Sequence, residues 1–114
     1  MNDCIFCKIV EGTIPSKKLY EDDLVLAFQD IDPKAPVHVL IIPKRHIESA
    51  QTLIAADYVE LCHMFEVSQK LASALGIADS GYRVVTNVGD AGGQSVPHLH
   101  LHLLGGRDMT WPPG

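Results

Sequence analysis

Three histidines, His98, His100 and His102, alternate with leucines near the C-terminal end of the chain. Strict alternation of polar and apolar residues predicts a half-buried β-strand, because successive side chains of a strand point to opposite faces. The leucines are then expected to enter the core, and the imidazoles to follow one another along the other face at intervals of roughly 6.6 Å. A row of imidazoles on one face offers the groups needed for acid, base and nucleophilic chemistry.

Two other interpretations of this row are weaker. A solvated strand face more often carries Thr, Lys or Glu than a group of closely spaced histidines. A single metal ion shared by all three is disfavoured, because His98 and His102 are separated by about 13 Å of strand. Separate roles for the three imidazoles fit the spacing better.

The row can act on a phosphate ester or amide. One neutral imidazole can attack phosphorus and form a phosphohistidine-type intermediate, while its neighbours hydrogen-bond the phosphate oxygens. His100 is flanked on both sides, so we predict that it is the nucleophile, and Ser95 can pass a proton to the leaving group. The glycine-rich loop of residues 89–93 forms either a plain turn or a set of backbone N–H groups close to an anion. Its position shortly before the histidines favours the second interpretation.

Cys4 and Cys7 form a Cys-x2-Cys pair near the start of the chain. The spacing suits two thiolate ligands of one zinc ion, but two further ligands must come from elsewhere. Two half-buried thiols on a short helix explain the pair equally well. The chain has three cysteines, and this odd number is typical of a reducing compartment and argues against a disulfide framework.

Length and composition predict one domain over residues 1–114, with 46% hydrophobic residues to build its core. The formal net charge of -5 argues against binding a nucleic acid polymer, but a small phosphate ligand can be held by backbone N–H groups and neutral side chains. The longest nearly apolar run, residues 35–43, is too short to span a bilayer, and no basic segment followed by an apolar one indicates export. We therefore expect a cytoplasmic protein that does not bind membranes.

Periodicity and turn residues predict the elements that position these groups. A short helix is expected over residues 4–10, capped by Asp3 and ended by Gly12, with its apolar stripe in the core. His38 lies within an apolar strand and reaches the histidine row if the two strands pair. Before that row four strands are expected, of which the first two form a hairpin. They cover residues 18–21, 24–30, 37–43 and 82–88.

A long helix is expected over roughly residues 55–75, ended by Gly76. Cys62 belongs to its apolar face and is expected in the core, whereas His63 lies off that face and is expected in solvent. In the tail, Trp111 is expected to dock on its own domain or on another subunit, because the prolines beside it prevent a helix or a central strand. The predicted apolar face comprises Tyr58, Leu61, Cys62, Phe65, Leu71, Ala72 and Leu75.

Residues 98–104 match the motif His-φ-His-φ-His-φ-φ, with φ apolar, at every position, and the chain therefore resembles the histidine-triad superfamily of nucleotide hydrolases and transferases. The resemblance covers nearly the whole chain, including Ala-Pro-x-His, Ile-Pro-Lys-x-His and Gly-Gly-Gln-Ser-Val. The ending Gly-Gly-Arg-x-Met-x-Trp-Pro-Pro-Gly is similar to that of one branch, the purine nucleoside phosphoramidases or histidine-triad nucleotide-binding proteins. The resemblance implies an α+β fold with a five-stranded antiparallel sheet, one long and one short helix, and a homodimer formed through the long helix and the strand before it.

The same resemblance implies hydrolysis of adenosine or guanosine 5'-phosphoramidates to a nucleoside monophosphate and an amine, through a nucleotidyl intermediate on His100. His102 and Ser95 would contact the phosphate or the leaving group, and His38 and His98 would orient the site. Part of the stripe on the first helix would then face the purine rather than the core. The other implied nucleotide contacts are Asp30 at the ribose, Asn87 at the phosphate, Gln94 and Val96 in the loop before the triad, Ile5, Phe6, Ile9, Phe28 and Leu40 around the base, and Trp111 near the partner's site.

Cys4 and Cys7 are absent from many phosphoramidases but occur in relatives that bind structural zinc. The remaining zinc ligands in those relatives resemble His46 and His98. A zinc ion here would tie the first helix to the sheet and would not be required for catalysis. Two alternative functions stay open: a dinucleoside polyphosphate hydrolase, which would share the triad but not the Trp-Pro-Pro-Gly tail, and a non-catalytic nucleotide-binding or metal-binding interaction module, which would need less chemistry than the triad and Ser95 provide.

Overall fold

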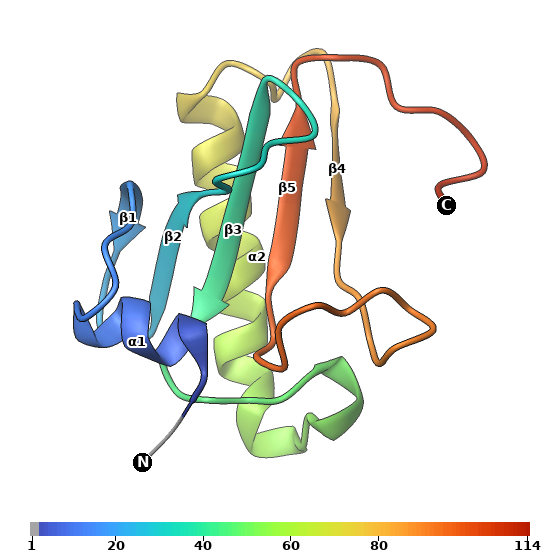
Figure 1. The fold of residues 1–114 in the computed structure, drawn as a ribbon. Coiled ribbons are helices and arrows are strands. Elements are labelled where there is room, and N and C mark those ends of the chain that lie inside the picture. The colour runs from blue at the N-terminus through green and yellow to red at the C-terminus, as the bar shows by residue number, and fades with distance from the viewer. Residues whose placement is uncertain (1–2) are drawn as a thin grey trace.

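The computed structural model describes residues 3–114, which form a five-stranded antiparallel sheet with a helix on each face (Figure 1). The strand order is β1-β2-β3-β5-β4, so the last strand enters the sheet between two earlier ones. This architecture confirms the predicted α+β class. The elements are α1 (Ile5–Glu11), β1 (Lys18–Glu21), β2 (Val25–Gln29), β3 (Val37–Pro43), the 3-10 helices η1 (Ala50–Thr52) and η2 (Ala55–Asp57), α2 (Tyr58–Ala74), β4 (Tyr82–Val85) and β5 (Leu101–Gly105).

The alternation of side chains along β2 and β3 divides the core between the two faces of the sheet. One set of side chains packs with α2, which crosses behind the sheet, and the other packs with α1, which lies in front of it (Figure 1). Both sets are buried, as expected for central strands covered on both faces. The first set is Val25, Ala27, Val39 and Ile41, and the second is Leu26, Phe28, Leu40 and Ile42.

The pairing of β3 with β5 places His38 beside the histidine row, as predicted. In this antiparallel pair His38 lies opposite Leu104, and Leu40 lies opposite His102. Opposed residues share a face of the sheet, and so do residues two apart on one strand. His38 and His102 are therefore diagonal neighbours on the face that α1 covers.

The regular part of the histidine strand is shorter than predicted, since β5 begins at Leu101 and not at His98. Pro43 ends the neighbouring strand and has no N–H to continue the ladder, which gives the physical reason. Alternation still holds through the irregular residues, because Leu99 is buried like the leucines after it and its N–H donates to the Ile47 carbonyl over 2.6 Å. The leucines enter the core as expected.

The first helix begins one residue later than predicted, and its cap is Cys4 rather than Asp3. The Cys4 Sγ accepts a hydrogen bond from the backbone N–H of Cys7 over 3.4 Å. Gly12 ends the helix in the left-handed conformation with φ of 86°, as its sequence position indicated. Strands β2 and β4 are also shorter than predicted, ending at Gln29 and Val85.

The long helix buries only part of the predicted face, and Leu71 and Ala72 are buried as expected. The rest of that face was expected in the core but is largely exposed, at Tyr58, Cys62, Phe65 and Leu75. His63, expected in solvent, is partly buried and bonds to carboxylates on either side of its ring. The helix is apolar around much of its circumference, and periodicity alone does not indicate which face meets the sheet. The buried residues of α2 are Met64, Val67, Ser68, Leu71 and Ala72.

The strand before the long helix is β3, and it is hydrogen-bonded on both sides within the sheet. Its backbone is therefore not free to extend the sheet into a second chain, and the expected homodimer stays a prediction. The edge strands are β1 and β4. Within residues 3–114 no helix combines the length and the apolar character needed to cross a membrane.

Candidate active site

His38, His100 and His102 bring their rings together on the face of the sheet that α1 covers. The ring centroids of His100 and His102 are 5.0 Å apart, and those of His38 and His102 are 5.2 Å apart. The ring of His98 lies 4.9 Å from that of His46 and its Nδ1 is directed toward the N-terminal cysteines. The structure thus divides the predicted triad between two neighbouring sites.

One hydrogen bond determines which nitrogen of His100 can react. The Nδ1 of His100 lies 2.6 Å from the carbonyl oxygen of His98, and because a carbonyl only accepts, Nδ1 carries the proton. The Nε2 of the neutral ring then has the available lone pair. The Phe6 ring packs edge-on against this imidazole, with ring centroids 5.0 Å apart, and helps to hold its orientation. His100 is thereby prepared to act as a nucleophile through Nε2.

A chain of hydrogen bonds indicates where His38 and His102 carry their protons. The backbone N–H of Lys34 donates to His38 Nδ1 over 3.0 Å, so neutral His38 has its proton on Nε2. This Nε2 lies 2.9 Å from His102 Nδ1, which accepts, and 3.4 Å from Asp30 Oδ2. Neutral His102 consequently has its proton on Nε2, from which it can be donated to a ligand.

Burial favours the neutral form of the imidazoles in this region. It lowers the pKa of His38 and His100 below the ordinary value, and it lowers the pKa of His98 and His102 to about 4. The main cause is that the charged ring loses hydration, and neighbouring imidazoles lower the pKa of His98 and His102 further. Near neutral pH, His100 therefore keeps the lone pair that a nucleophile needs.

A cavity of about 330 Å³ opens beside His100 and His102. Its walls are largely apolar, with polar groups near the histidines, which is typical of a small-molecule site. Ten predicted catalytic or nucleotide-binding residues line it: Ile5, Phe6, Ile9, Phe28, Asp30, Leu40, Ser95, Val96, His100 and His102. Sequence reasoning missed five lining residues, Ile14, Pro15, Ser16, Gln29 and Ile31, most of which lie in loops or at a strand end, where periodicity carries no signal.

Within residues 3–114, three of the predicted nucleotide contacts do not line this cavity: Asn87, Gln94 and Trp111. Asn87 is half-buried in the segment after β4, and Trp111 is 82% exposed in the C-terminal tail. The Gln94 side chain holds a loop together: its Nε2 donates to the carbonyls of Glu48 and Val96, and its Oε1 accepts from the N–H of Gly89. In this structure Gln94 therefore positions the segment that carries Ser95.

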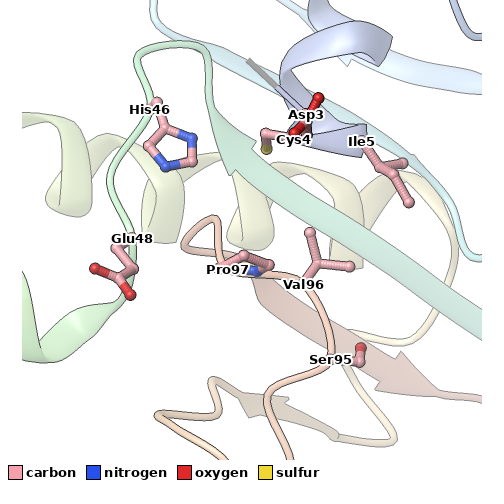
Figure 2. A pocket seen from close by; sticks show the side chains of 8 residues that line it. All are labelled: Asp3, Cys4, Ile5, His46, Glu48, Ser95, Val96 and Pro97. Carbon is pink, nitrogen blue, oxygen red and sulfur yellow. The ribbon is translucent and has the colours of Figure 1, made fainter.

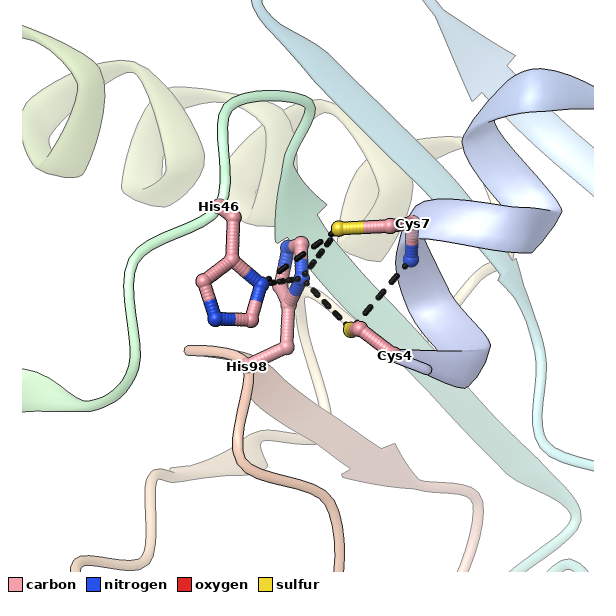
Figure 3. Close-up of side chains that lie close together, drawn as sticks. All are labelled: Cys4, Cys7, His46 and His98. Atoms are coloured by element: carbon pink, nitrogen blue, oxygen red, sulfur yellow. Dashed lines mark hydrogen bonds between the residues drawn. The ribbon is translucent and has the colours of Figure 1, made fainter. Parts of the chain in front are cut away.

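A second group of side chains brings together the four predicted metal ligands, Cys4, Cys7, His46 and His98 (Figure 3). The His98 Nδ1 lies 3.2 Å from the Cys4 Sγ, 3.6 Å from the Cys7 Sγ and 3.2 Å from the His46 Nδ1. The Cys7 Sγ lies 3.4 Å from the His46 Nδ1. The cluster joins the start of α1 to the segments that follow β3 and precede β5.

These separations fit a tetrahedral ion. Zinc–nitrogen and zinc–sulfur bonds of about 2.1 and 2.3 Å give tetrahedron edges of roughly 3.4–3.8 Å, close to the four distances of the cluster. His98 is also in the tautomer that a ligand needs, because its Nε2 lies 2.9 Å from the Pro43 carbonyl oxygen and must donate to it. The Nδ1 lone pair of the neutral ring then points into the cluster.

A larger cavity of about 570 Å³ lies between this cluster and the loop before the triad (Figure 2). It shares Ile5, Ser95 and Val96 with the smaller cavity. The reactive imidazoles of His100 and His102 line the smaller cavity and not the larger one, so the smaller cavity is the candidate active site. The other residues of the larger cavity are Asp3, Cys4, His46, Glu48 and Pro97.

Comparison with known proteins agrees with this geometry. The family model described as HIT domain matches residues 11–109. An uncharacterized HIT-like protein of Synechococcus elongatus is 49% identical over 112 residues, which cover 98% of this chain and 97% of the relative. The structure of a HIT family hydrolase from Legionella pneumophila superposes with a TM-score of 0.97 at 52% identity, covering 98% of this chain and 100% of that one. The structure of a histidine triad nucleotide-binding protein from Candida albicans superposes with a TM-score of 0.82 at 37% identity, covering 96% of this chain and 83% of that one.

The sheet order, the triad motif and these matches define the class of protein. The chain belongs to the HIT family, the histidine-triad superfamily that the motif at residues 98–104 indicated.

Proposed function

We propose that this protein is a nucleotide-binding hydrolase that cleaves the P–N bond of purine nucleoside 5'-phosphoramidates. The observation that carries the proposal is the state of His100: its Nδ1 is held by the His98 carbonyl, and its ring lines a cavity with apolar walls. The similarity to a structure named as a HIT family hydrolase and to one named as a nucleotide-binding protein supports the reaction class and the ligand.

In the proposed reaction the His100 Nε2 attacks the phosphorus, and the P–N bond breaks. The departing nitrogen keeps the electron pair of that bond and takes a proton, supplied by His102 Nε2–H directly or through the Ser95 hydroxyl. Water then gives a proton back to His102 Nε2 as its oxygen attacks the phosphorus of the nucleotidyl-histidine, the P–N bond to His100 breaks with its electron pair returning to His100 Nε2, and the nucleoside monophosphate leaves. His38 orients His102 through the 2.9 Å hydrogen bond.

The other lining residues are given binding roles. Asp30 contacts the ribose hydroxyls, although its Oδ1 also accepts from the N–H of Asp32 over 2.8 Å. Phe6 and Phe28, whose rings meet edge-on at 5.6 Å, form part of the apolar wall against the base. Asn87 and Trp111 lie outside the cavity of the single chain, and we propose that Trp111 lies near the active site of a partner subunit.

We also propose that the chain forms a homodimer through the exposed face of α2. Val59 is 73% exposed and Phe65 is 45% exposed on this helix, and Cys62 lies between them at helical spacing. Large apolar side chains gathered on one face of a helix commonly mark a protein interface.

The cysteine–histidine cluster is proposed to hold zinc. The ion would be bound by two thiolates and two Nδ1 atoms, and its role would be structural, because the four donors complete a tetrahedron and leave no position for substrate. His98 would serve both sites, with its side chain in the cluster and its carbonyl on His100.

The proposed reaction can be tested by intact-mass analysis during turnover of an adenosine 5'-phosphoramidate. The wild type should transiently gain the mass of one nucleotidyl group, and His100→Ala should gain none and lose turnover. His63→Ala, which removes a histidine far from the cavity, is the matched control and should still form the adduct. An adduct on His100→Ala would refute the nucleophile. Preferential cleavage of a dinucleoside polyphosphate would refute the substrate class, and binding of nucleotide without adduct or turnover would refute the enzyme.

A further inference from the structure

Ser16 carries a buried hydroxyl that no part of the free protein satisfies. Among residues 3–114, its Oγ is the buried side-chain oxygen or nitrogen that has no hydrogen-bond partner. Such groups are rare in folded proteins because a hydroxyl removed from water without a new partner destabilises the folded state. Ser16 also lines the candidate active-site cavity. A buried, unpaired hydroxyl at a cavity wall is typical of a group whose partner is a ligand.

The sheet register places Ser16 at the end of the cavity that is remote from the catalytic histidines. Lys18, Phe28, Leu40 and His102 form one row across β1, β2, β3 and β5. Three steps between neighbouring strands put the β1 end of this row about 14 Å from His102. Ser16 comes two residues before Lys18, so the cavity extends from the histidines to Ser16 over a length comparable to that of a nucleoside monophosphate.

The chain around Ser16 is held in place on both sides. The N–H of Gln29 donates to the Lys17 carbonyl over 3.0 Å, which fixes the segment beside the end of β2. On the other side, the N–H of Ile14 donates to the Lys8 carbonyl over 3.3 Å, which ties the segment to α1. Ser16 is thus presented to the cavity by a constrained segment, so its hydroxyl can meet a ligand without reordering the backbone.

We propose that the Ser16 hydroxyl hydrogen-bonds the edge of the bound purine, which makes Ser16 a specificity-determining residue of the nucleotide site. The inference rests on the proposed function, because it requires a nucleotide with its phosphate at His100. The lining residues Ile9, Ile14 and Phe28 are apolar and can pack on the faces of a base but cannot pair with its ring nitrogens or exocyclic groups. The Ser16 hydroxyl can form a hydrogen bond with these polar groups of the base, and this bond forms only when the nucleotide is bound.

The test compares wild type, Ser16→Ala and the matched control Ser80→Ala, an exposed serine outside the cavity. Binding of AMP and of ribose 5-phosphate, which lacks the base, is measured by calorimetry. We expect Ser16→Ala to weaken AMP binding roughly 3- to 10-fold, as for one lost neutral hydrogen bond, and to leave ribose 5-phosphate binding unchanged. In turnover of the phosphoramidate, KM should rise and kcat should hold. Ser80→Ala should match wild type throughout.

The melting temperature of the free protein separates this role from a structural one. Since Ser16→Ala removes an unpaired buried hydroxyl, the free variant should melt at or above the wild-type temperature while binding AMP more weakly. Unchanged AMP affinity, equal weakening of both ligands, or a lower melting temperature would overturn the role of Ser16 and leave the proposed function standing. If wild type itself fails to bind AMP, the proposed function and this inference both fall.

Discussion

Removal of the proposed zinc ion should destabilise the fold and disturb the active site together, because the His98 side chain lies in the cysteine–histidine cluster and its carbonyl bonds His100. The replacement Cys7→Ser removes a buried thiol of the proposed site, whose Sγ lies 3.4 Å from the His46 Nδ1 and 3.6 Å from the His98 Nδ1. An ion that binds only the folded chain stabilises it by about 4 kcal/mol when its free concentration is a thousand times its dissociation constant. For a chain of this length, about 4 °C per kcal/mol gives a shift in melting temperature of roughly 15 °C.

The assay is calorimetric unfolding of wild type and Cys7→Ser at one protein concentration, with zinc or with a chelator. Wild type should contain about one zinc per chain by elemental analysis after purification without chelators. Chelation should lower the melting temperature of the wild type by roughly 15 °C, whereas Cys7→Ser should have the lower melting temperature in either buffer. Cys62→Ser, at an exposed position outside the cluster, is the control and should keep the full zinc effect. A wild type that carries no metal, or that melts alike in zinc and in chelator, would refute the zinc site.

Two further predictions follow from α2. His63 lies between Asp22 and Glu66, and its hydrogen bond to Asp22 raises its pKa above the ordinary 6.5, so its contribution to stability is complete below about pH 6.5 and is lost as the pH rises through the raised value. His63→Ala should therefore reduce the free energy of unfolding, measured in urea titrations, by about 1–2 kcal/mol at pH 6 and by less at pH 9. An equal loss at the two pH values would contradict a stabilising role for the charged His63 ring between Asp22 and Glu66. Val59→Asp should convert the proposed homodimer into a folded monomer in analytical ultracentrifugation, and a wild type that sediments as a monomer would contradict the dimer.

The sequence predicted the parts of this structure that depend on strong local patterns. The predicted bounds of β3 match the observed ones, because a β-branched apolar run between two prolines strongly favours a strand over a helix. His38 was expected beside the triad only on the condition that two distant strands pair, and the register supplies that condition. The motif at residues 98–104 indicated the family, which the comparisons confirm.

The errors lie where tertiary contacts decide. The long helix is apolar on two faces, and only its contact with the sheet selects Met64 and Val67 over Tyr58 and Phe65 for burial. His63 was expected in solvent because it lies off the predicted apolar face, and its partner Asp22, 41 residues away, gives no local signal in the sequence. Ser16 gave no sequence signal, since a serine after a proline is ordinary in a loop, and its burial without a partner is visible only in three dimensions.

The position of β5 between β3 and β4 also bears on how this protein matures during synthesis. The hairpin β1–β2 and its pairing with β3 join neighbouring segments and can form early, but His38 meets a partner 64 residues further along the chain. Pairings over such separations form slowly, because a long loop must be closed before they contribute any stability. Until the final strand emerges from the ribosome, β3 presents an unsatisfied edge rich in valine and isoleucine, the kind of nascent surface that chaperones shield from aggregation.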